Sequence, residues 1–128
     1  MSRNSIGSEL TERQEHILLA DWIRAHESQV PELKLAFHVP NEGKHKVQYR
    51  VLQARLLVRP GVPDIIIPVP KKTYLGLIIE LKRRKGAKAS KAQEEWLKEL
   101  SKIGYLCVLA KGHEEAISSI RYYFDIRG

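Results

Sequence analysis

Two apolar segments separated by a short turn constrain the fold of this chain most strongly. Residues 64–69 include three consecutive isoleucines, and residues 74–81 are apolar almost throughout. Continuous apolar runs of this length are typical of strands that are buried on both faces. The sequence Pro-Lys-Lys-Thr at 70–73 is typical of a turn, so we expect the two strands to pair as an antiparallel hairpin.

The rest of the chain predicts helices and shorter strands around this hairpin. Thr11 with Gln14, and Ser90 with Gln93, have the spacing of a helix-capping box. The remaining segments follow from apolar periodicity and from proline and glycine breaks. In chain order we expect a helix from Ser8 or Thr11 to about Glu27, a strand at 33–39, a helix at 47–58, strands at 64–69 and 74–81, a helix from Ser90 to Gly104, a strand at 105–110 and a helix at 113–124.

This α-β-α-β-β-α-β-α order predicts an α/β fold with a mixed central sheet flanked by helices. The 128 residues are enough for one domain with a buried core, and residues 1–7 are expected to be a flexible tail. The single cysteine, Cys107, excludes an internal disulfide and a cysteine-built zinc site. No apolar run is long enough to span a membrane, and the first residues have no apolar segment typical of a secretory signal, so we expect a cytoplasmic protein.

The positive charge of the chain is concentrated in one segment. The formal net charge is +7, from 22 Lys and Arg against 15 Asp and Glu. Residues 71–91 carry eight of these basic side chains and one acid, so the remainder is neutral. A basic segment on a neutral body indicates contact with a polyanion, most simply nucleic acid, although a solvated lysine-rich loop would have the same composition.

Both strands of the predicted hairpin carry an acid near one end. If the turn centres near Lys72, Asp64 lies directly opposite Glu80. Lys82 follows two residues after Glu80 and shares its face, whereas Leu81 faces the other side and its carbonyl lies along the strand edge.

Two opposed carboxylates repel unless a proton or a cation lies between them. Carboxylate and carbonyl oxygens suit Mg²⁺ or Mn²⁺, and a neighbouring lysine can orient a water that attacks phosphorus. The alternative is structural, because Glu80 could simply pair with Lys82 or Lys71 at the strand end.

Several motifs in register resemble one known family. Pro63-Asp64 followed by Glu80-Leu81-Lys82 matches the PD-(D/E)xK nuclease pattern. The surrounding sequence resembles the VRR-NUC family, the virus-type replication-repair nucleases, over residues ~9–124. The segments that carry the resemblance are His38-Val39-Pro40-Asn41, Arg59-Pro60-Gly61-Val62-Pro63-Asp64, residues 74–82, residues 90–97 and Gly104-Tyr105.

This resemblance implies a restriction-endonuclease-like core and a set of site residues. Asp64, Glu80 and the Leu81 carbonyl would bind the metal, and Lys82 would be the catalytic lysine. Gln93 lies at the family's glutamine position, which favours a role in the site, and as the third helical residue after Ser90 it could complete the helix cap instead or as well. The family also has a glutamate on the first helix, for which alignment on Trp22 selects Glu12, with Glu15 one turn later as the alternative.

The resemblance further implies a metal-dependent DNA endonuclease that uses Mg²⁺ or Mn²⁺. A chain with the nuclease core alone resembles Holliday-junction resolvases of phage or bacterial origin, which implies a homodimer acting on branched DNA in a bacterial or phage-infected cell. The alternatives are a nicking, flap or single-strand nuclease of the same fold, a DNA-binding module without activity, and a protein-interaction domain. His38 is a candidate for the edge of the site. The residues expected to contact DNA are Asn41, Arg83, Arg84, Lys85, Lys88 and Lys91.

Overall fold

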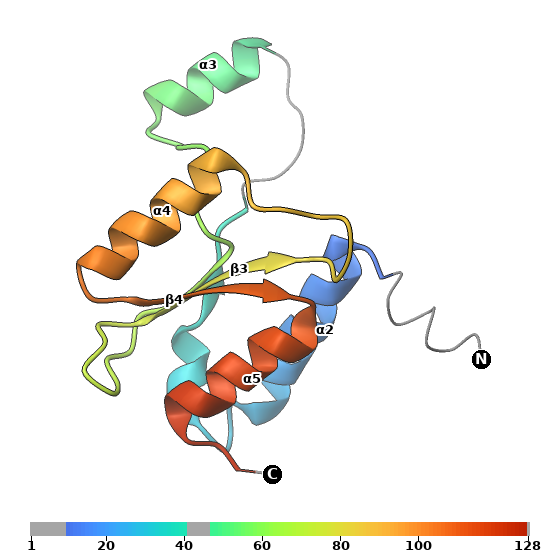
Figure 1. Ribbon diagram of the computed structural model, residues 1–128, viewed down its shortest axis with the longest axis vertical. Helices are drawn as coiled ribbons and strands as arrows, with labels where there is room; N and C mark the ends of the chain where they lie inside the picture. The colour runs from blue at the N-terminus through green and yellow to red at the C-terminus, as the bar shows by residue number, and fades with distance from the viewer. Residues whose placement is uncertain (1–9, 41–46, 128) are drawn as a thin grey trace.

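A computed structural model describes residues 10–40 and 47–127 (Figure 1). Its elements follow the predicted order, with one additional 3₁₀ turn. They are α2 (Glu12–His26), the 3₁₀ helix η1 (Pro31–Leu35), β1 (Phe37–His38), α3 (Val47–Arg55), β2 (Ile65–Ile67), β3 (Leu77–Lys82), α4 (Lys91–Lys102), β4 (Leu106–Lys111) and α5 (His113–Phe124). The expected tail at 1–7 and the expected DNA contact at Asn41 lie outside the described residues.

The described strands form a four-stranded sheet in the order β1-β2-β3-β4. The first two pairings are antiparallel and β3 pairs with β4 in parallel, so the sheet is mixed as predicted. In the hairpin, Ile65 lies opposite Ile79 and Ile67 lies opposite Leu77. This is the register that the sequence predicts, and one more step along it places Asp64 opposite Glu80.

The segment expected to form a strand at 33–39 is different in the structure. Residues Pro31–Leu35 form a 3₁₀ turn, and only Phe37–His38 pair with the sheet. Proline at the first position of this turn fixes φ near the helical value and lacks the donor that a strand would use. The turn also buries Leu33 completely, which a strand at the edge of the sheet would not need to do.

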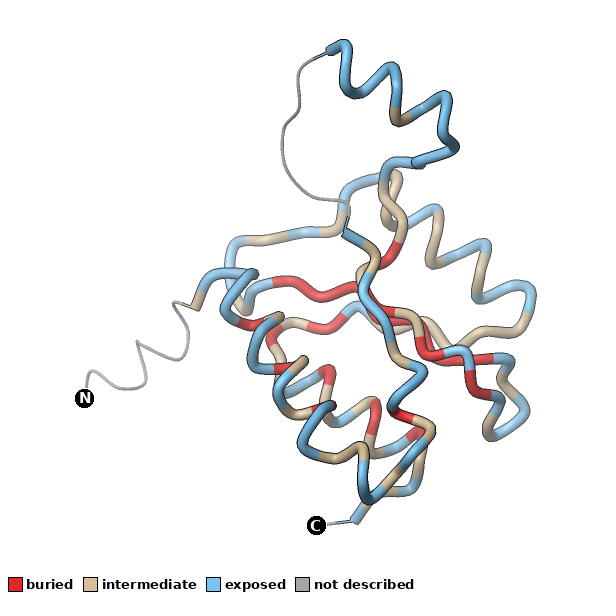
Figure 2. The backbone as a smooth tube through the Cα atoms, turned by 180° about the vertical axis from the view of Figure 1, so that it is seen from behind, coloured by how far each residue is buried: buried red, intermediate tan, exposed pale blue. Residues whose placement is uncertain are grey.

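Different helices pack on the two faces of the sheet. Helices α2 and α5 pack on one face, where the main core joins Leu77, Ile79 and Leu81 to side chains of both helices. Side chains alternate along a strand, so Glu80 and Lys82 point to the opposite face, on which α4 lies (Figure 1). Figure 2 shows the buried residues gathered on the strands and on the inner sides of these helices. Within the part of the chain described, no helix is long and apolar enough to cross a membrane.

The connection that leads into Asp64 is held against the first turn of α4. The Trp96 Nε1–H donates to the Pro60 carbonyl over 2.9 Å. Gly61 has a φ of +78°, and a Cβ placed there would lie 2.7 Å from the carbonyl carbon of Ala92. The chain approaches α4 so closely that only glycine fits.

A Gly61→Ala variant is therefore expected to lose roughly 2 kcal/mol or more of unfolding free energy, measured by chemical denaturation. Gly86 is the matched control because it has a φ of +77° but the nearest atom to its added Cβ is a flexible Arg83 side-chain nitrogen at 3.4 Å. Gly86→Ala should lose only the cost of the backbone conformation, about 1 kcal/mol. Equal losses in the two variants would contradict the close packing.

Candidate active site

Asp64 and Glu80 meet at the end of the hairpin. The backbone N–H of Leu81 donates to Asp64 Oδ2 over 2.8 Å, which fixes the Asp64 carboxylate against β3. The Glu80 side chain is 1% exposed, and Lys82 Nζ lies 3.5 Å from its Oε2 atom. The two acids and the lysine that the sequence selects are therefore brought together.

Burial raises the pKa of the Glu80 carboxyl to about 8, and the nearby charges of Asp64 and Glu12 add to this effect while Lys82 opposes it. Burial also raises the pKa of Asp64, against the lowering effects of the Leu81 hydrogen bond and of nearby positive charge. Within the described structure, neither carboxylate oxygen of Glu80 has a hydrogen-bond partner of good geometry, and the contact that Oε2 makes is the 3.5 Å ion pair with Lys82. Buried oxygens without donors are suited to a proton or a bound cation.

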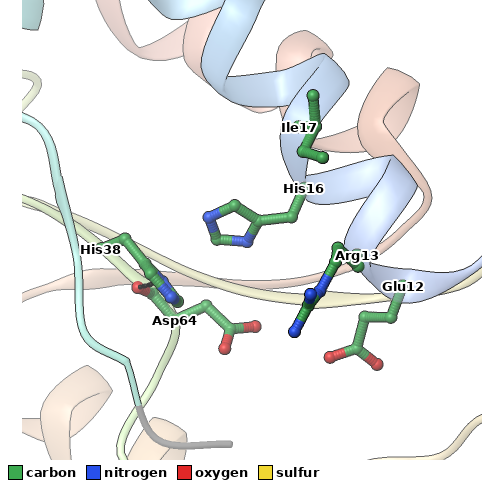
Figure 3. A pocket seen from close by; sticks show the side chains of 6 residues that line it. All are labelled: Glu12, Arg13, His16, Ile17, His38 and Asp64. Atoms are coloured by element: carbon green, nitrogen blue, oxygen red, sulfur yellow. Dashed lines mark hydrogen bonds between the residues drawn. The ribbon is translucent and has the colours of Figure 1, made fainter.

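A cleft of about 300 Å³ opens beside Asp64 (Figure 3). It lies between the first turns of α2 and the end of β1, and its walls carry both acidic and basic side chains. The residues that line it are Glu12, Arg13, His16, Ile17, His38 and Asp64. The cleft gives a phosphate group or a hydrated ion access to Asp64 from solvent.

Two histidines form one side of this cleft. The His16 and His38 rings meet edge to face with their centroids 4.2 Å apart. His38 Nδ1 lies 3.0 Å from the Asp64 carbonyl oxygen, a hydrogen bond in which the ring nitrogen carries the proton. Both histidines lower the pKa of Asp64. His38 was predicted from the sequence, whereas Arg13 and His16 were not. The four-residue spacing from Glu12 to His16 is about one helical turn and could have indicated His16.

The structure separates the two candidate glutamates of α2. Glu12 lines the cleft and acts electrostatically on Glu80. Glu15 is fully buried elsewhere, where its Oε1 accepts the His113 N–H over 2.8 Å and lies 2.6 Å from His113 Nδ1. Its Oε2 lies 3.4 Å from Arg84 Nε. Glu15 therefore holds the start of α5 in place, and Glu12 is the acid that faces the site.

Substitutions of these two glutamates should separate stability from activity. Glu15→Ala removes a buried carboxylate with charge-assisted hydrogen bonds, so the unfolding free energy should fall by about 2–3 kcal/mol. Glu12→Ala changes an exposed side chain and should cost less than about 1 kcal/mol while lowering any cleavage activity. Urea denaturation and a cleavage assay on the same preparations would measure both effects. The reverse pattern would identify Glu15 as the site residue.

Other residues selected from the sequence have structural partners. Gln93 completes the capping box of α4, since its N–H donates to Ser90 Oγ and its Oε1 accepts the Ser90 N–H. Arg84, expected to contact DNA, pairs with Glu15 and with Glu114, the latter at 2.9 Å, and its DNA contact stays a prediction. Within the basic segment that follows Lys82, the exposed basic side chains are those of Arg83, Lys85, Lys88 and Lys91.

The residues of the site fit a divalent cation in part. No group of three or more His, Cys, Asp or Glu side chains within residues 10–40 and 47–127 is arranged to hold an ion. Two carboxylates and a backbone carbonyl leave several positions of an octahedral ion for water and phosphate, as Mg²⁺ prefers. The two unsatisfied oxygens of Glu80 are the observation that fits such an ion.

Comparisons with known proteins show a family of similar sequence and fold. The sequence model of the VRR-NUC domain matches residues 9–114. A solved structure described as a VRR_NUC domain protein is 30% identical in sequence, with a TM-score of 0.77 over 91% of this chain and 90% of that one. No curated protein has significant sequence similarity to this chain. The chain therefore belongs to the VRR-NUC family, whose domain is a nuclease of the PD-(D/E)xK type.

Proposed function

We propose that this protein is a metal-dependent DNA endonuclease that cuts branched DNA, with activity like that of a Holliday-junction resolvase. The observation that carries the proposal is Glu80, a buried carboxylate with two unsatisfied oxygens beside Asp64 and Lys82. Asp64, Glu80, the Leu81 carbonyl and Glu12 would hold Mg²⁺ or Mn²⁺. Burying the Glu80 carboxylate beside a second acid costs free energy of folding unless the pair binds a ligand.

The metal, when bound, would lower the pKa of its water and neutralise charge on the phosphate. The chain's own residues would position the water and the acids. Lys82 is 8% exposed and its Nζ lies 3.5 Å from Glu80 Oε2, so its ammonium is held at the site, where it would orient the attacking water toward phosphorus. The attacking water would give up one proton to solvent as its oxygen forms the new bond to phosphorus. The bond to the leaving oxygen breaks, and that oxygen takes up a proton from solvent. Asp64 is held in place by the Leu81 N–H throughout.

The preference for DNA shape over base sequence follows from the exposed basic side chains of the segment after Lys82. Arg83, Lys85, Lys88 and Lys91 carry point charges that suit the phosphate backbone. A four-way junction needs two symmetric cuts, and a twofold homodimer would supply two sites. These two arguments support branched DNA as the substrate and a homodimer as the active form.

The test is a cleavage assay on a labelled four-way junction and a linear duplex of matched sequence, in Mg²⁺, in Mn²⁺ and in EDTA. Paired symmetric cuts on the junction that need both metal and Glu80 would support the proposal, with Glu80→Ala as the control. Equal cutting of both substrates would leave a nuclease without junction preference. Flap, nicked and single-stranded substrates distinguish the other nuclease activities of the fold, and binding without cutting in either metal would identify a DNA-binding module.

A further inference from the structure

Helix α3 projects from the body of the protein and has little packing of its own (Figures 1 and 2). None of its residues, all of which are described, is buried. Its apolar side chains are instead open to solvent, with exposed fractions of 63% for Val47, 55% for Val51 and 48% for Leu52. Leu56 and Leu57, directly after the helix, are 66% and 68% exposed.

Such a helix needs a partner for two physical reasons. A helix of nine residues is too short to be stable alone in water, because isolated helices below about 12–15 residues are marginal. Each large apolar side chain left in water also forgoes about 1.5–3 kcal/mol of burial free energy. Contiguous exposed apolar residues of this kind mark an interaction surface.

The charge of α3 identifies the kind of surface it fits. Residues 47–63 contain no Asp or Glu and carry Arg50, Arg55 and Arg59. The helical spacing places Val47, Val51 and Ala54 in one stripe, with Arg50 and Arg55 on either side of it. A complementary surface would be apolar in the middle and acidic at its edge.

The chain carries such a surface on α4. A groove of about 310 Å³ is lined by Ala92, Trp96, Glu95 and Glu99. Both glutamates are exposed, and the Trp96 ring is fixed by its hydrogen bond to the Pro60 carbonyl. All four lining residues belong to α4, so the chain's own α3 does not fill the groove. The two helices also stand apart in both views (Figures 1 and 2).

We propose that α3 of one chain docks into the α4 groove of a second copy of the same chain. Both halves of the contact are present on each chain, so a twofold axis makes the contact twice and covers the stripe of Val47, Val51 and Ala54 on both copies. The apolar stripe would lie on Ala92 and Trp96, and Arg50 and Arg55 would face Glu95 and Glu99 of the partner copy. The inference deepens the proposed function, since it assigns the dimer surface, but the association it describes needs neither metal nor DNA.

The first test is the mass of the full chain in solution, measured by sedimentation equilibrium without metal or DNA. We expect a dimer in the wild type and at least a tenfold weaker association in Val51→Asp, in an α3 variant with Arg50→Glu and Arg55→Glu, and in an α4 variant with Glu95→Lys and Glu99→Lys. Lys98→Glu is the control, because it changes a charge on α4 outside the groove. Circular dichroism and the thermal midpoint would confirm that each variant is folded.

Mixing the two charge-reversed proteins gives the sharper test. Each alone places like charges in both contacts and should be a monomer, whereas the mixture pairs reversed α3 with reversed α4 and wild-type α3 with wild-type α4. A heterodimer in the mixture would support the proposal. A wild-type protein that is a monomer would overturn it, and so would a dimer that tolerates all these substitutions. If the protein is a monomer and its α3 variants lose DNA affinity, α3 is a DNA-contacting helix instead. Cleavage by a monomer would overturn this inference while leaving the nuclease assignment intact.

Discussion

A Lys82→Ala variant is expected to cleave junction DNA at least about a thousandfold more slowly than the wild type, which corresponds to about 4 kcal/mol of lost transition-state stabilisation. The cause is the position of Lys82, whose side chain is 10% exposed and whose Nζ lies 3.5 Å from Glu80 Oε2. No other lysine within the described structure pairs with Glu80 or lowers its pKa. Asp64→Ala should have an effect of the same order, because its carboxylate is held by β3 on the opposite side of the site. Single-turnover cleavage with enzyme in excess measures the chemical step.

The binding of DNA should change little in both variants, as measured by fluorescence anisotropy in EDTA. Lys85→Ala is the matched control, since Lys85 is an exposed lysine three residues after Lys82. Its loss should weaken binding and reduce the salt dependence while leaving the single-turnover rate within about threefold at saturating enzyme. If Lys82→Ala cut at the wild-type rate, the lysine would have no part in the reaction and the site assignment would be wrong.

The arrangement of Asp64 and Glu80 could be predicted from the sequence because the hairpin is local. Only nine residues separate the paired strands β2 and β3, and the turn near Lys72 fixes which residues are opposed. The capping boxes at Thr11 and Ser90 were predictable for the same reason, because each depends on residues three positions apart.

Contacts between distant segments could not be predicted. Glu15 accepts hydrogen bonds from His113, which lies 98 residues later, and periodicity along α2 carries no information about that partner. Arg84 also pairs with Glu15, a contact between residues 69 positions apart that the sequence does not indicate. Leu33 shows the related difficulty at η1, where its burial and Pro31 override the local strand pattern.

The stability of the metal-free protein should fall as the pH rises, because the folded state holds a proton on Glu80 that the unfolded state releases. Burial raises the pKa of Glu80 from an ordinary 4.5 to about 8. Between these two values the folded chain binds more protons than the unfolded chain, so the unfolding free energy decreases with pH. The contribution of Glu80 to the unfolding free energy is highest below pH 4.5. It falls by a few kcal/mol between pH 4.5 and about pH 8 and then levels off. Thermal unfolding at pH 6 and at pH 9 in EDTA measures the difference.

Glu80→Gln is the control that isolates this carboxyl, since the amide has the same shape and does not ionise. The variant should show a smaller decrease between pH 6 and pH 9 and should be the more stable protein at pH 9. Mn²⁺ at pH 8 should raise the thermal midpoint of the wild type, because the ion replaces the proton between two repelling carboxylates and binds only the folded state. It should leave Glu80→Gln nearly unchanged. Parallel pH curves together with equal shifts in Mn²⁺ would show that Glu80 neither holds the proton nor binds the metal, and the structural pairing of Glu80 with Lys82 would then be its whole role.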